Sequence, residues 1–356
     1  MSAAPGVTPA LRVLIVDDSR TSRAVLSEIC THDPDMSVVG EAADGEEAVD
    51  LTARLHPDVV VMDITMPRLD GFGATRRIMA TTPTPVVLVT AANDPTAVDV
   101  AMRALEAGAL TVLAKPDGPL AHGGNREAER FRARVKLLSQ VKVIRRYPDR
   151  LERRRGAVSA AVAGGPAPKA IAVAASTGGP QALCRFLTPF AADFTAPILI
   201  VQHIVRGFIT GLVSWLDDRV DLHVKVAAHG ESLKGGTVYV APDDAHLSVT
   251  ATGRVALDRG PAVGGFRPSA TPLFEAAARV YGDGLIAVVL TGMGSDGLHG
   301  ARTVRDRGGT VLAQDQRTSV VFGMPGVVIA AGLASGVGDA SELAHRILRD
   351  GTGRSM

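Results

Sequence analysis

Short runs rich in valine and isoleucine alternate with helical patterns along most of the 356-residue chain. A strand that is apolar at nearly every position is buried on both faces, as in a parallel sheet covered by helices. In the first half we expect helices near Thr21–His32, Glu46–Leu55, Gly73–Met79 and Ala97–Ala107, and strands at Arg12–Val16, Val38–Ala42, Val59–Met62, Val86–Thr90 and Thr111–Ala114.

A second series begins at Ala170 and shares no motif with the first. The fold class is therefore α/β, with two doubly wound sheets in two domains, the second Rossmann-like and mostly parallel. We expect helices near Gln181–Thr188, Phe208–Asp217, Ser269–Val280, Gly300–Arg307 and Val327–Ala331, and strands at Ile171–Ala174, Ile198–Gln202, Val224–Ala227, Thr237–Ala241, Leu247–Thr250, Leu285–Leu290 and Thr310–Ala313.

The segment between the two series differs from both in composition. Residues 126–155 contain twelve Lys or Arg against four Asp or Glu. Apolar residues recur in it at helical spacing, which predicts an amphipathic helix that either docks onto an acidic surface or is a solvated linker helix. An Ala/Gly/Pro-rich run, 156–169, is typical of a flexible tether. The domain prediction is a tail at 1–10, a first domain at 11–118, a basic helix and flexible linker at 119–168, a second domain at 169–348 and a tail at 349–356.

Charge and hydropathy exclude several classes of protein. The net charge of +1 gives no electrostatic case for binding nucleic acid. We expect no direct insertion into a membrane, because no apolar run approaches about 18 residues. The N-terminus does not resemble a signal peptide, so we expect a cytoplasmic protein. The two cysteines, Cys30 and Cys184, have no metal-ligand spacing, and we expect them to fill helix faces.

Three carboxylates follow strands of the first domain: Asp17 and Asp18 end the first strand, and Asp63 ends the third. In an open parallel sheet these strand ends line the functional crevice. Crowded carboxylates repel one another unless a hard cation binds, and oxygen ligands favour Mg²⁺. Thr90 and Lys115 end the fourth and fifth strands, where a hydroxyl and an ammonium can contact a phosphoryl group carried by a carboxylate.

This order of residues and the phrase "MDITMPRLDG" resemble a response-regulator receiver domain, a flavodoxin-like (βα)₅ fold, over residues 11–117. The resemblance implies that Asp63 accepts a phosphoryl group from a sensor histidine kinase. It also implies that Asp17, Asp18 and Asp63 hold Mg²⁺, and that Thr90 and Lys115 contact the phosphoryl group.

Two residues of this domain depart from the receiver pattern. Val112 replaces an aromatic residue that acts as a rotameric switch, and Thr65 stands two residues after the phosphoacceptor, where relatives usually have Glu. Lys115–Pro116 is in addition a candidate cis peptide bond that would fix the direction of the lysine.

In the second domain, three residues of different chemical types follow three strands. Ser176 follows the first strand, His203 the second, and Asp296 lies in the glycine-rich turn of "AVVLTGMGSDG". A serine becomes a nucleophile when an imidazole takes its proton and a carboxylate holds the imidazole. Gly178 and Gly179 allow backbone N–H groups at the following helix to approach an oxyanion.

Other interpretations of these motifs compete with a catalytic triad. A glycine turn before a helix also binds phosphate, but "ASTGG" matches no phosphate-loop pattern and no lysine closes it. Ser176 alone could be a helix cap. His246 and His299 compete with His203 as the base, and we rank them lower because one follows a hairpin loop and the other belongs to the next helix.

The motifs "ASTGGP", "QHIVRGF", "VYVAPDDAHL", "GFRPSATPLF", "LTGMGSDG" and "VFGMP" occur in the order found in chemotaxis protein-glutamate methylesterases, over about residues 169–345. The resemblance implies that Ser176 is the nucleophile, His203 the base and Asp296 the orienting acid. Thr177 and Met293 then supply the backbone donors of the oxyanion hole. Four residues depart from the family pattern, and we expect them to alter substrate fit more than chemistry: Ala175, Ile204, Val205 and Thr271.

The resemblance implies a phosphorylation-controlled serine esterase that removes methyl groups from glutamate methyl esters of chemoreceptor cytoplasmic domains. It also implies deamidation of receptor glutamines, with Mg²⁺ needed for phosphorylation and no cofactor for the esterase reaction. We expect the unphosphorylated receiver to restrict access to the catalytic strand ends. The alternatives are a signalling adaptor with a vestigial triad and a nucleotide-binding output domain.

Overall fold

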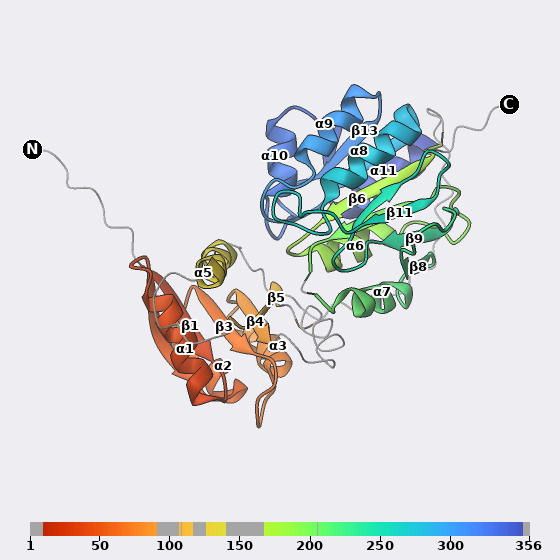
Figure 1. Ribbon diagram of the computed structural model, residues 1–356. Coiled ribbons are helices and arrows are strands. Elements are labelled where there is room, and N and C mark those ends of the chain that lie inside the picture. Colours follow the sequence, from red (N-terminus) through yellow and green to blue (C-terminus); the bar gives the residue numbers. More distant parts are fainter. Residues whose placement is uncertain are drawn as a thin grey trace, which may run out of the picture. The chain divides into compact units, whose positions relative to one another are not determined.

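The computed structural model describes residues 10–90, 107, 109–116, 126–139, 167–204 and 206–351. The chain divides into two compact units, Met1–Arg153 and Arg154–Met356 (Figure 1). Residues 156–166 of the predicted tether, most of the helix predicted at Ala97–Ala107, and Val205 lie outside the described residues. Within the described ranges, no helix is both long and apolar enough to cross a membrane.

The first unit contains a five-stranded parallel sheet in the order β2-β1-β3-β4-β5. Its central strands are fully buried, because each is apolar on both faces and helices cover them. The five predicted strands are confirmed, with ends that differ by at most two residues. The strands are β1 (Leu11–Val16), β2 (Met36–Ala42), β3 (Val59–Asp63), β4 (Val86–Thr90) and β5 (Thr111–Ala114), and the helices α1 (Arg20–Thr31), α2 (Gly45–Leu55), α3 (Gly71–Thr81) and α5 (Arg126–Ser139).

Helix α5 lies on the first unit rather than in a linker. Its apolar residues Phe131, Val135 and Leu138 are buried, and the Arg132 guanidinium donates a hydrogen bond of 3.4 Å to the carbonyl of Ile29 in α1. Lys136 forms ion pairs with Asp33 (2.7 Å) and Asp35 (3.0 Å). The amphipathic helix is therefore as expected, but its assignment to the linker was wrong, because the apolar face packs in a core and Lys136 finds acidic partners within its own unit.

The second unit is built on a seven-stranded sheet in the order β14-β13-β12-β6-β7-β9-β8, and every neighbouring pair in it is parallel. A separate antiparallel pair, β10 and β11, lies beside it. The strands are β6 (Ala170–Ala175), β7 (Ile198–Gln202), β8 (His223–Val226), β9 (Thr237–Val240), β10 (His246–Val249), β11 (Val255–Asp258), β12 (Leu285–Val289), β13 (Thr310–Gln314) and β14 (Gly336–Gly338).

Helices cover both faces of this sheet, which confirms the predicted doubly wound fold (Figure 1). One face packs α8, α9, α10 and the hairpin into a single apolar core, and α6, α7 and α11 cover the other face. The helices are α6 (Gly179–Leu187), α7 (Ile209–Asp217), α8 (Ala270–Tyr281), α9 (Leu298–Asp306), α10 (Met324–Ala330) and α11 (Ala340–Gly351). The sequence analysis did not identify β11, β14 and α11.

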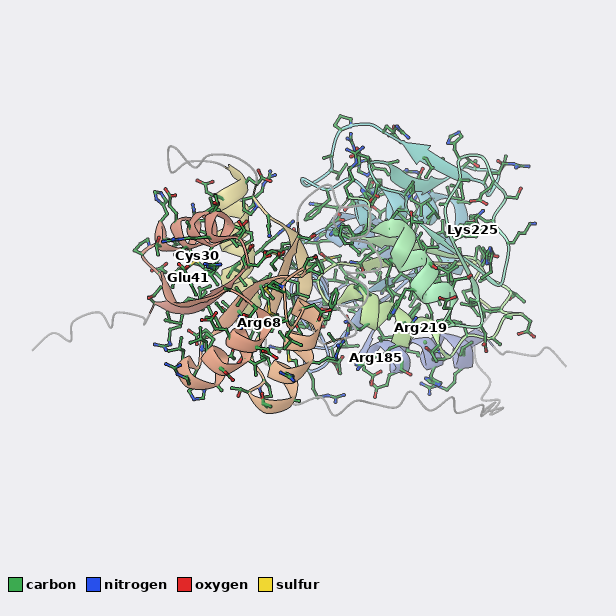
Figure 2. The ribbon with its side chains drawn as sticks, turned by 90° about the horizontal axis from the view of Figure 1, so that it is seen from below. Cys30, Glu41, Arg68, Arg185, Arg219 and Lys225 are labelled. Atoms are coloured by element: carbon green, nitrogen blue, oxygen red, sulfur yellow. The ribbon has the colours of Figure 1, made fainter. Side chains whose placement is uncertain are left out.

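Figure 2 shows the side chains within both units. Cys30 is buried in α1, as expected of a residue that fills a helix face, and burial raises the pKa of its thiol to about 12. Cys184 is a half-buried residue of α6 whose thiol pKa is also raised by burial. Neither cysteine has the character of a reactive thiolate.

The packing of α5 predicts a stability effect confined to the first unit. Removing the buried ring in Phe131→Ala should cost about 3–5 kcal/mol of the unfolding free energy of that unit, as for other large-to-small core substitutions. Hydrogen exchange of the full chain should show faster exchange in β1 and β3, and unchanged protection in β6 and β12. Glu129→Ala, on the exposed side of the same helix, serves as the matched control. Unchanged protection of β1 in Phe131→Ala would contradict the assignment of α5 to this unit.

Candidate functional site

The first unit brings together the acidic residues that the sequence placed at its strand ends. Carboxylate oxygens of Asp17, Asp18 and Asp63 all lie within 4.8 Å of one another. Asp17 and Asp63 are buried, and Asp18 is exposed. Such convergent oxygen atoms fit a hard divalent cation that keeps several water ligands. These residues could therefore hold Mg²⁺, which would neutralise negative charge at the site.

Lys115 supplies a positive charge to the same cluster. Its ammonium lies 2.7 Å from Asp17 Oδ2 and 3.0 Å from Asp63 Oδ1. Burial acts to lower the pKa of Lys115, but hydrogen bonds and charge from Asp17 and Asp63 outweigh it and raise the pKa. The backbone N–H of Lys115 donates to the carbonyl of Thr90 (2.8 Å), so the ends of β4 and β5 are held together.

The Asp63 carboxyl lies in an environment that disfavours its charge. Burial raises its pKa above the ordinary value, and Lys115 offsets this only in part. Val112, at the usual aromatic position, is buried in β5 opposite Leu88, and Thr65 is exposed. Arg267–Pro268 is the single cis peptide among the described residues, so the prediction of a cis bond at Lys115–Pro116 was wrong.

In the second unit, β6 lies between β7 and β12, and the residues that follow these strands meet at one edge of the sheet. The backbone N–H of Ser176 donates to the carbonyl of Thr291 (3.0 Å), and that of His203 donates to the carbonyl of Ala175 (3.0 Å). Gly292 is also close, because a Cβ atom added there would lie 2.7 Å from Cβ of Ser176. The structure thus brings the loops of Ser176, His203 and Asp296 together.

Gln202 connects the backbones of two candidate residues. Its side chain is buried at the end of β7, and Nε2 donates hydrogen bonds of 2.8 Å to the carbonyls of Ser176 and His203. A Cβ atom at Gly179 would overlap Oε1 of Gln202, so the glycine also makes room for this side chain. The sequence analysis did not single out Gln202, although it is a polar residue at the end of an apolar strand.

His203 and Asp296 form a hydrogen-bonded pair, with Nε2 of the imidazole 2.8 Å from Oδ2 of the carboxylate. A carboxylate is only an acceptor, so Nε2 carries the proton and the neutral ring presents its lone pair at Nδ1. That Nδ1 atom is buried and has no hydrogen-bond partner among the described residues. Ser176 Oγ makes no hydrogen bond to His203 in the described part of the chain, and such bonds often tighten only when substrate binds.

The start of helix α8 holds Asp296. Oδ1 accepts hydrogen bonds from Ser269 Oγ (2.6 Å), Thr271 Oγ1 (3.1 Å) and the backbone N–H of Gly297 (2.9 Å), and Oδ2 accepts one from the backbone N–H of Ala270 (2.7 Å). Burial alone would raise the pKa of Asp296, but the bonds from His203, Ser269 and Ala270 outweigh it and lower the pKa. The site therefore keeps this carboxylate ionised.

Thr271 contacts the carboxylate of Asp296. Its hydroxyl donates to Asp296 and accepts from the N–H of Gly297 (3.1 Å), so it belongs to the support of the carboxylate. The expectation that this departure affects substrate fit more than chemistry stays a prediction, and the hydroxyl contacts given for Thr271 are with Asp296 and Gly297. Ser269 was also missed as a functional residue, although a serine at the start of a predicted helix is a recognisable cap.

The loops after β6 and β12 contain two N–H groups available to a ligand. The backbone N–H groups of Thr177 and Met293 donate to no other residue within the described ranges. Thr291 Oγ1 donates to the carbonyl of Thr177 (2.9 Å) and links the two loops. Gly178 has φ of 76°, a left-handed conformation that glycine adopts without strain.

The competing histidines have other roles. His246 is buried, its Nε2 lies 3.0 Å from the carbonyl of Pro261, and its Nδ1 accepts from the backbone N–H of Ser269 (3.2 Å). It therefore supports the segment that binds Asp296. His299 is exposed in α9.

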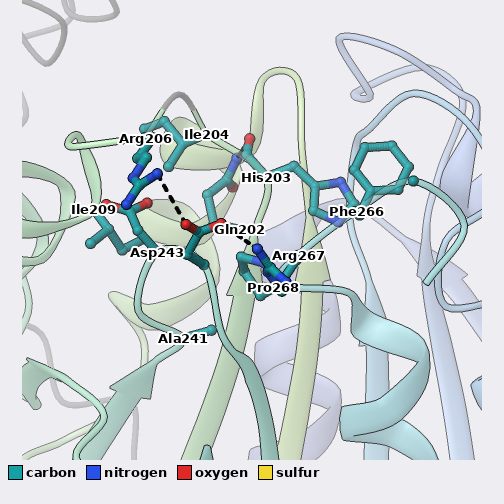
Figure 3. A pocket seen from close by; sticks show the side chains of 12 residues that line it. Gln202, His203, Ile204, Arg206, Ile209, Ala241, Asp243, Phe266, Arg267 and Pro268 are labelled. Carbon is teal, nitrogen blue, oxygen red and sulfur yellow. Dashed lines mark hydrogen bonds and ion pairs between the residues drawn. The ribbon is translucent and has the colours of Figure 1, made fainter. Parts of the chain in front are cut away.

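A half-open cavity of about 180 Å³ adjoins His203 (Figure 3). Apolar side chains of Ile204, Ile209 and Pro268 line it together with charged groups at its edge. Asp244 forms ion pairs with Arg206 (3.0 Å) and Arg267 (3.1 Å), so charges of both signs are paired there. The cavity offers room for a small apolar part of a substrate beside the imidazole.

Residues 171–347 match the family model described as CheB methylesterase, and residues 13–120 match the response regulator receiver domain. Protein-glutamate methylesterase/protein-glutamine glutaminase 4 of Myxococcus xanthus is 50% identical over 347 residues, which cover 95% of this chain and 96% of the relative. A similarly named protein of Pyrococcus abyssi is 38% identical over 95% of this chain and 93% of its own length. The catalytic domain of Thermotoga maritima CheB methylesterase covers 51% of this chain and 98% of its own, with 40% identity and a TM-score of 0.50.

The lowered pKa of Asp296 predicts a pH-dependent contribution to stability. A carboxyl group whose pKa is lower in the folded than in the unfolded state stabilises the fold fully above its unfolded pKa, about 4. This contribution is lost as pH falls through the folded value. Chemical unfolding should therefore show that Asp296→Asn destabilises the second unit most at neutral pH, and progressively less below about pH 4. Asp306→Asn, on the exposed side of α9, should show no such trend, and a pH-independent difference for Asp296→Asn would contradict the assignment.

Proposed function

This chain belongs to the CheB family of chemotaxis methylesterases that carry a receiver domain, and we propose that Ser176, His203 and Asp296 perform its hydrolytic reaction. The substrates are glutamate methyl esters and selected glutamines of chemoreceptor cytoplasmic domains. One observation carries the residue assignment: Nε2 of His203 is bound to Asp296, while its Nδ1 is left without a partner at the strand end next to Ser176.

The first half of the reaction forms an acyl-enzyme. Nδ1 of His203 takes the hydroxyl proton of Ser176 as Oγ attacks the γ-carboxyl carbon of the substrate glutamate. Asp296 stabilises the resulting imidazolium through Nε2–H. The backbone N–H groups of Thr177 and Met293 donate to the oxyanion of the tetrahedral intermediate. When the C–O bond to the methoxy group breaks, Nδ1–H protonates the leaving oxygen and methanol departs.

The second half restores the enzyme. Nδ1 removes a proton from water as the water oxygen attacks the acyl carbon, and the proton then passes to Ser176 Oγ as the ester bond breaks. The products are a glutamate side chain and free Ser176. With glutamine the same steps release ammonia, which requires that Nδ1–H protonate a poorer leaving group. We therefore propose that one serine serves both reactions.

We propose that phosphorylation of the receiver domain controls the rate of the esterase reaction. We propose that Asp63 accepts a phosphoryl group from a sensor histidine kinase, with Asp17, Asp18 and Asp63 as the Mg²⁺ ligands. Mg²⁺ supplies charge neutralisation when bound. Lys115, already within 3.0 Å of Asp63, and Thr90 at the end of β4 would contact the phosphoryl oxygens. A catalytically silent adaptor is not favoured, because the relatives across most of the chain are named as enzymes.

A single nucleophilic serine predicts the joint loss of both activities. In Ser176→Ala, methanol release from methylated receptor membranes and ammonia release from receptor glutamines should each fall by about 10³-fold or more. A fluorophosphonate probe should label the wild-type chain and Ser214→Ala, an exposed serine of α7, but not Ser176→Ala. Retention of ammonia release in Ser176→Ala would refute a shared nucleophile.

Phosphorylation at Asp63 predicts a metal-dependent change in esterase rate. Acetyl phosphate with Mg²⁺ should raise methanol release by the wild-type chain and by Asp50→Ala, an exposed aspartate of α2. The increase should be absent in Asp63→Ala. Chelation of Mg²⁺ should abolish the increase and leave the basal rate unchanged, since no triad residue is a metal ligand in this proposal. Equal stimulation of Asp63→Ala and the wild type would remove Asp63 from the control.

A further inference from the structure

The ring of Phe266 lies flat against the imidazole of His203. The two ring centroids are 4.1 Å apart and the planes differ by 5° (Figure 3). Phe266 is half-buried and lies outside the strands and helices of the second unit. None of the steps described for Ser176, His203 and Asp296 uses it, so its position beside the base calls for a separate explanation.

A tight turn presents this ring to His203. The backbones of Val263 and Phe266 exchange two hydrogen bonds of 3.0 Å. The two residues between them, Gly264 and Gly265, have φ of 61° and 86°, as a two-residue hairpin with positive φ at both positions requires. Phe266 is therefore the last residue of a defined hairpin turn rather than part of an irregular loop.

The chain that leaves this turn also holds the catalytic carboxylate. Arg267 is anchored by donating to the carbonyls of Arg259 (3.2 Å) and Gly260 (2.9 Å). Ser269 and Ala270 then donate to Asp296. The segment 266–271 thus contacts the base through Phe266 and the orienting acid through the start of α8, and it fixes both partners of the His203–Asp296 bond relative to each other.

His203 needs such a restraint. One hydrogen bond at Nε2 leaves the imidazole free to pivot about that contact, because Nδ1 has no partner among the described residues. The cavity beside His203 leaves free volume into which the ring could turn. Proton transfer requires the in-plane lone pair of Nδ1 to point at Ser176 Oγ. Rotation of the ring turns this lone pair away from the hydroxyl and prevents the transfer.

We propose that Phe266 is a positioning residue that holds the imidazole plane of His203 in the orientation needed to deprotonate Ser176. The inference rests on the proposed triad. The flat contact excludes water from one face of the ring and opposes its rotation, and aromatic contacts of this kind contribute measurably beyond buried area. A side chain without a flat face cannot replace it.

The test compares full-length variants at position 266 by methanol release. Phe266→Leu keeps an apolar side chain but removes the flat ring, and it should lower kcat about 5- to 10-fold with KM changed less than about twofold. Phe266→Tyr should stay within about twofold of the wild type. Val263→Ala, at the exposed partner position of the same turn, is the control and should leave both parameters unchanged. A loss confined to KM, or an equal loss in the leucine and tyrosine variants, would overturn the proposal.

A second measurement does not depend on turnover. The ring current of Phe266 should displace the carbon-bound imidazole proton resonances of His203 upfield, with assignment by comparison with His203→Gln. The displacement should persist in Phe266→Tyr and vanish in Phe266→Leu, together with faster solvent exchange of the Nε2 proton. Loss of the displacement with an unchanged exchange rate would show that the stack does not restrain the ring. If the wild type releases no methanol but shows the displaced resonances and slow Nε2 exchange, the esterase assignment is contradicted and the role of Phe266 in holding the ring is not.

Discussion

In the second unit β6 lies between β7 and β12 and is parallel to both. The arrangement of Ser176, His203 and Asp296 depends on this order. Because the three strands run in the same direction, the residues that follow them emerge at one edge, where Ser176 and the loop of Asp296 flank each other and His203 follows the adjacent strand. Backbone bonds then fix the spacing: Ser176 N–H to Thr291 O and His203 N–H to Ala175 O, both 3.0 Å. The proposed catalytic residues therefore share the rigidity of the sheet rather than that of long loops.

The pKa of a buried carboxylate is shifted in opposite directions in the two units. Burial and the charge of Asp17 raise the pKa of Asp63, the carboxylate that we propose binds a cation and takes a phosphoryl group. Asp296 is also buried, but the start of α8 supplies donors, and its pKa is lowered. At Asp63 burial thus outweighs the donors, whereas at Asp296 the donors outweigh burial.

Strand ends could be predicted from the sequence because apolar runs and the polar residue that ends each run are local features. This identified Asp17, Asp63, Ser176 and His203 at sheet edges. The support of Asp296 could not be predicted, because Ser269 and Thr271 are more than 20 residues away in sequence and meet it only when α8 packs beside the loop. The assignment of α5 failed for a related reason. Its basic composition suggested a linker, whereas its apolar residues pack in the core of the first unit and Lys136 pairs with acidic residues that are far away in sequence.

The orientation of His203 also determines which parts of the chain control the reaction. In the chymotrypsin-type triad Nε2 faces the serine, whereas here Nε2 faces Asp296 and we propose that Nδ1, which has no partner among the described residues, serves Ser176. Nδ1 is bonded directly to Cγ, so it lies closer to the backbone than Nε2 does. The distance from base to nucleophile therefore follows the relative position of the β6 and β7 backbones. Gln202 bonds to the carbonyls of both Ser176 and His203 and stabilises that position, while the far end of the ring depends on Asp296. Strand register sets where the base atom lies, and the side-chain contacts of the imidazole set where its lone pair points.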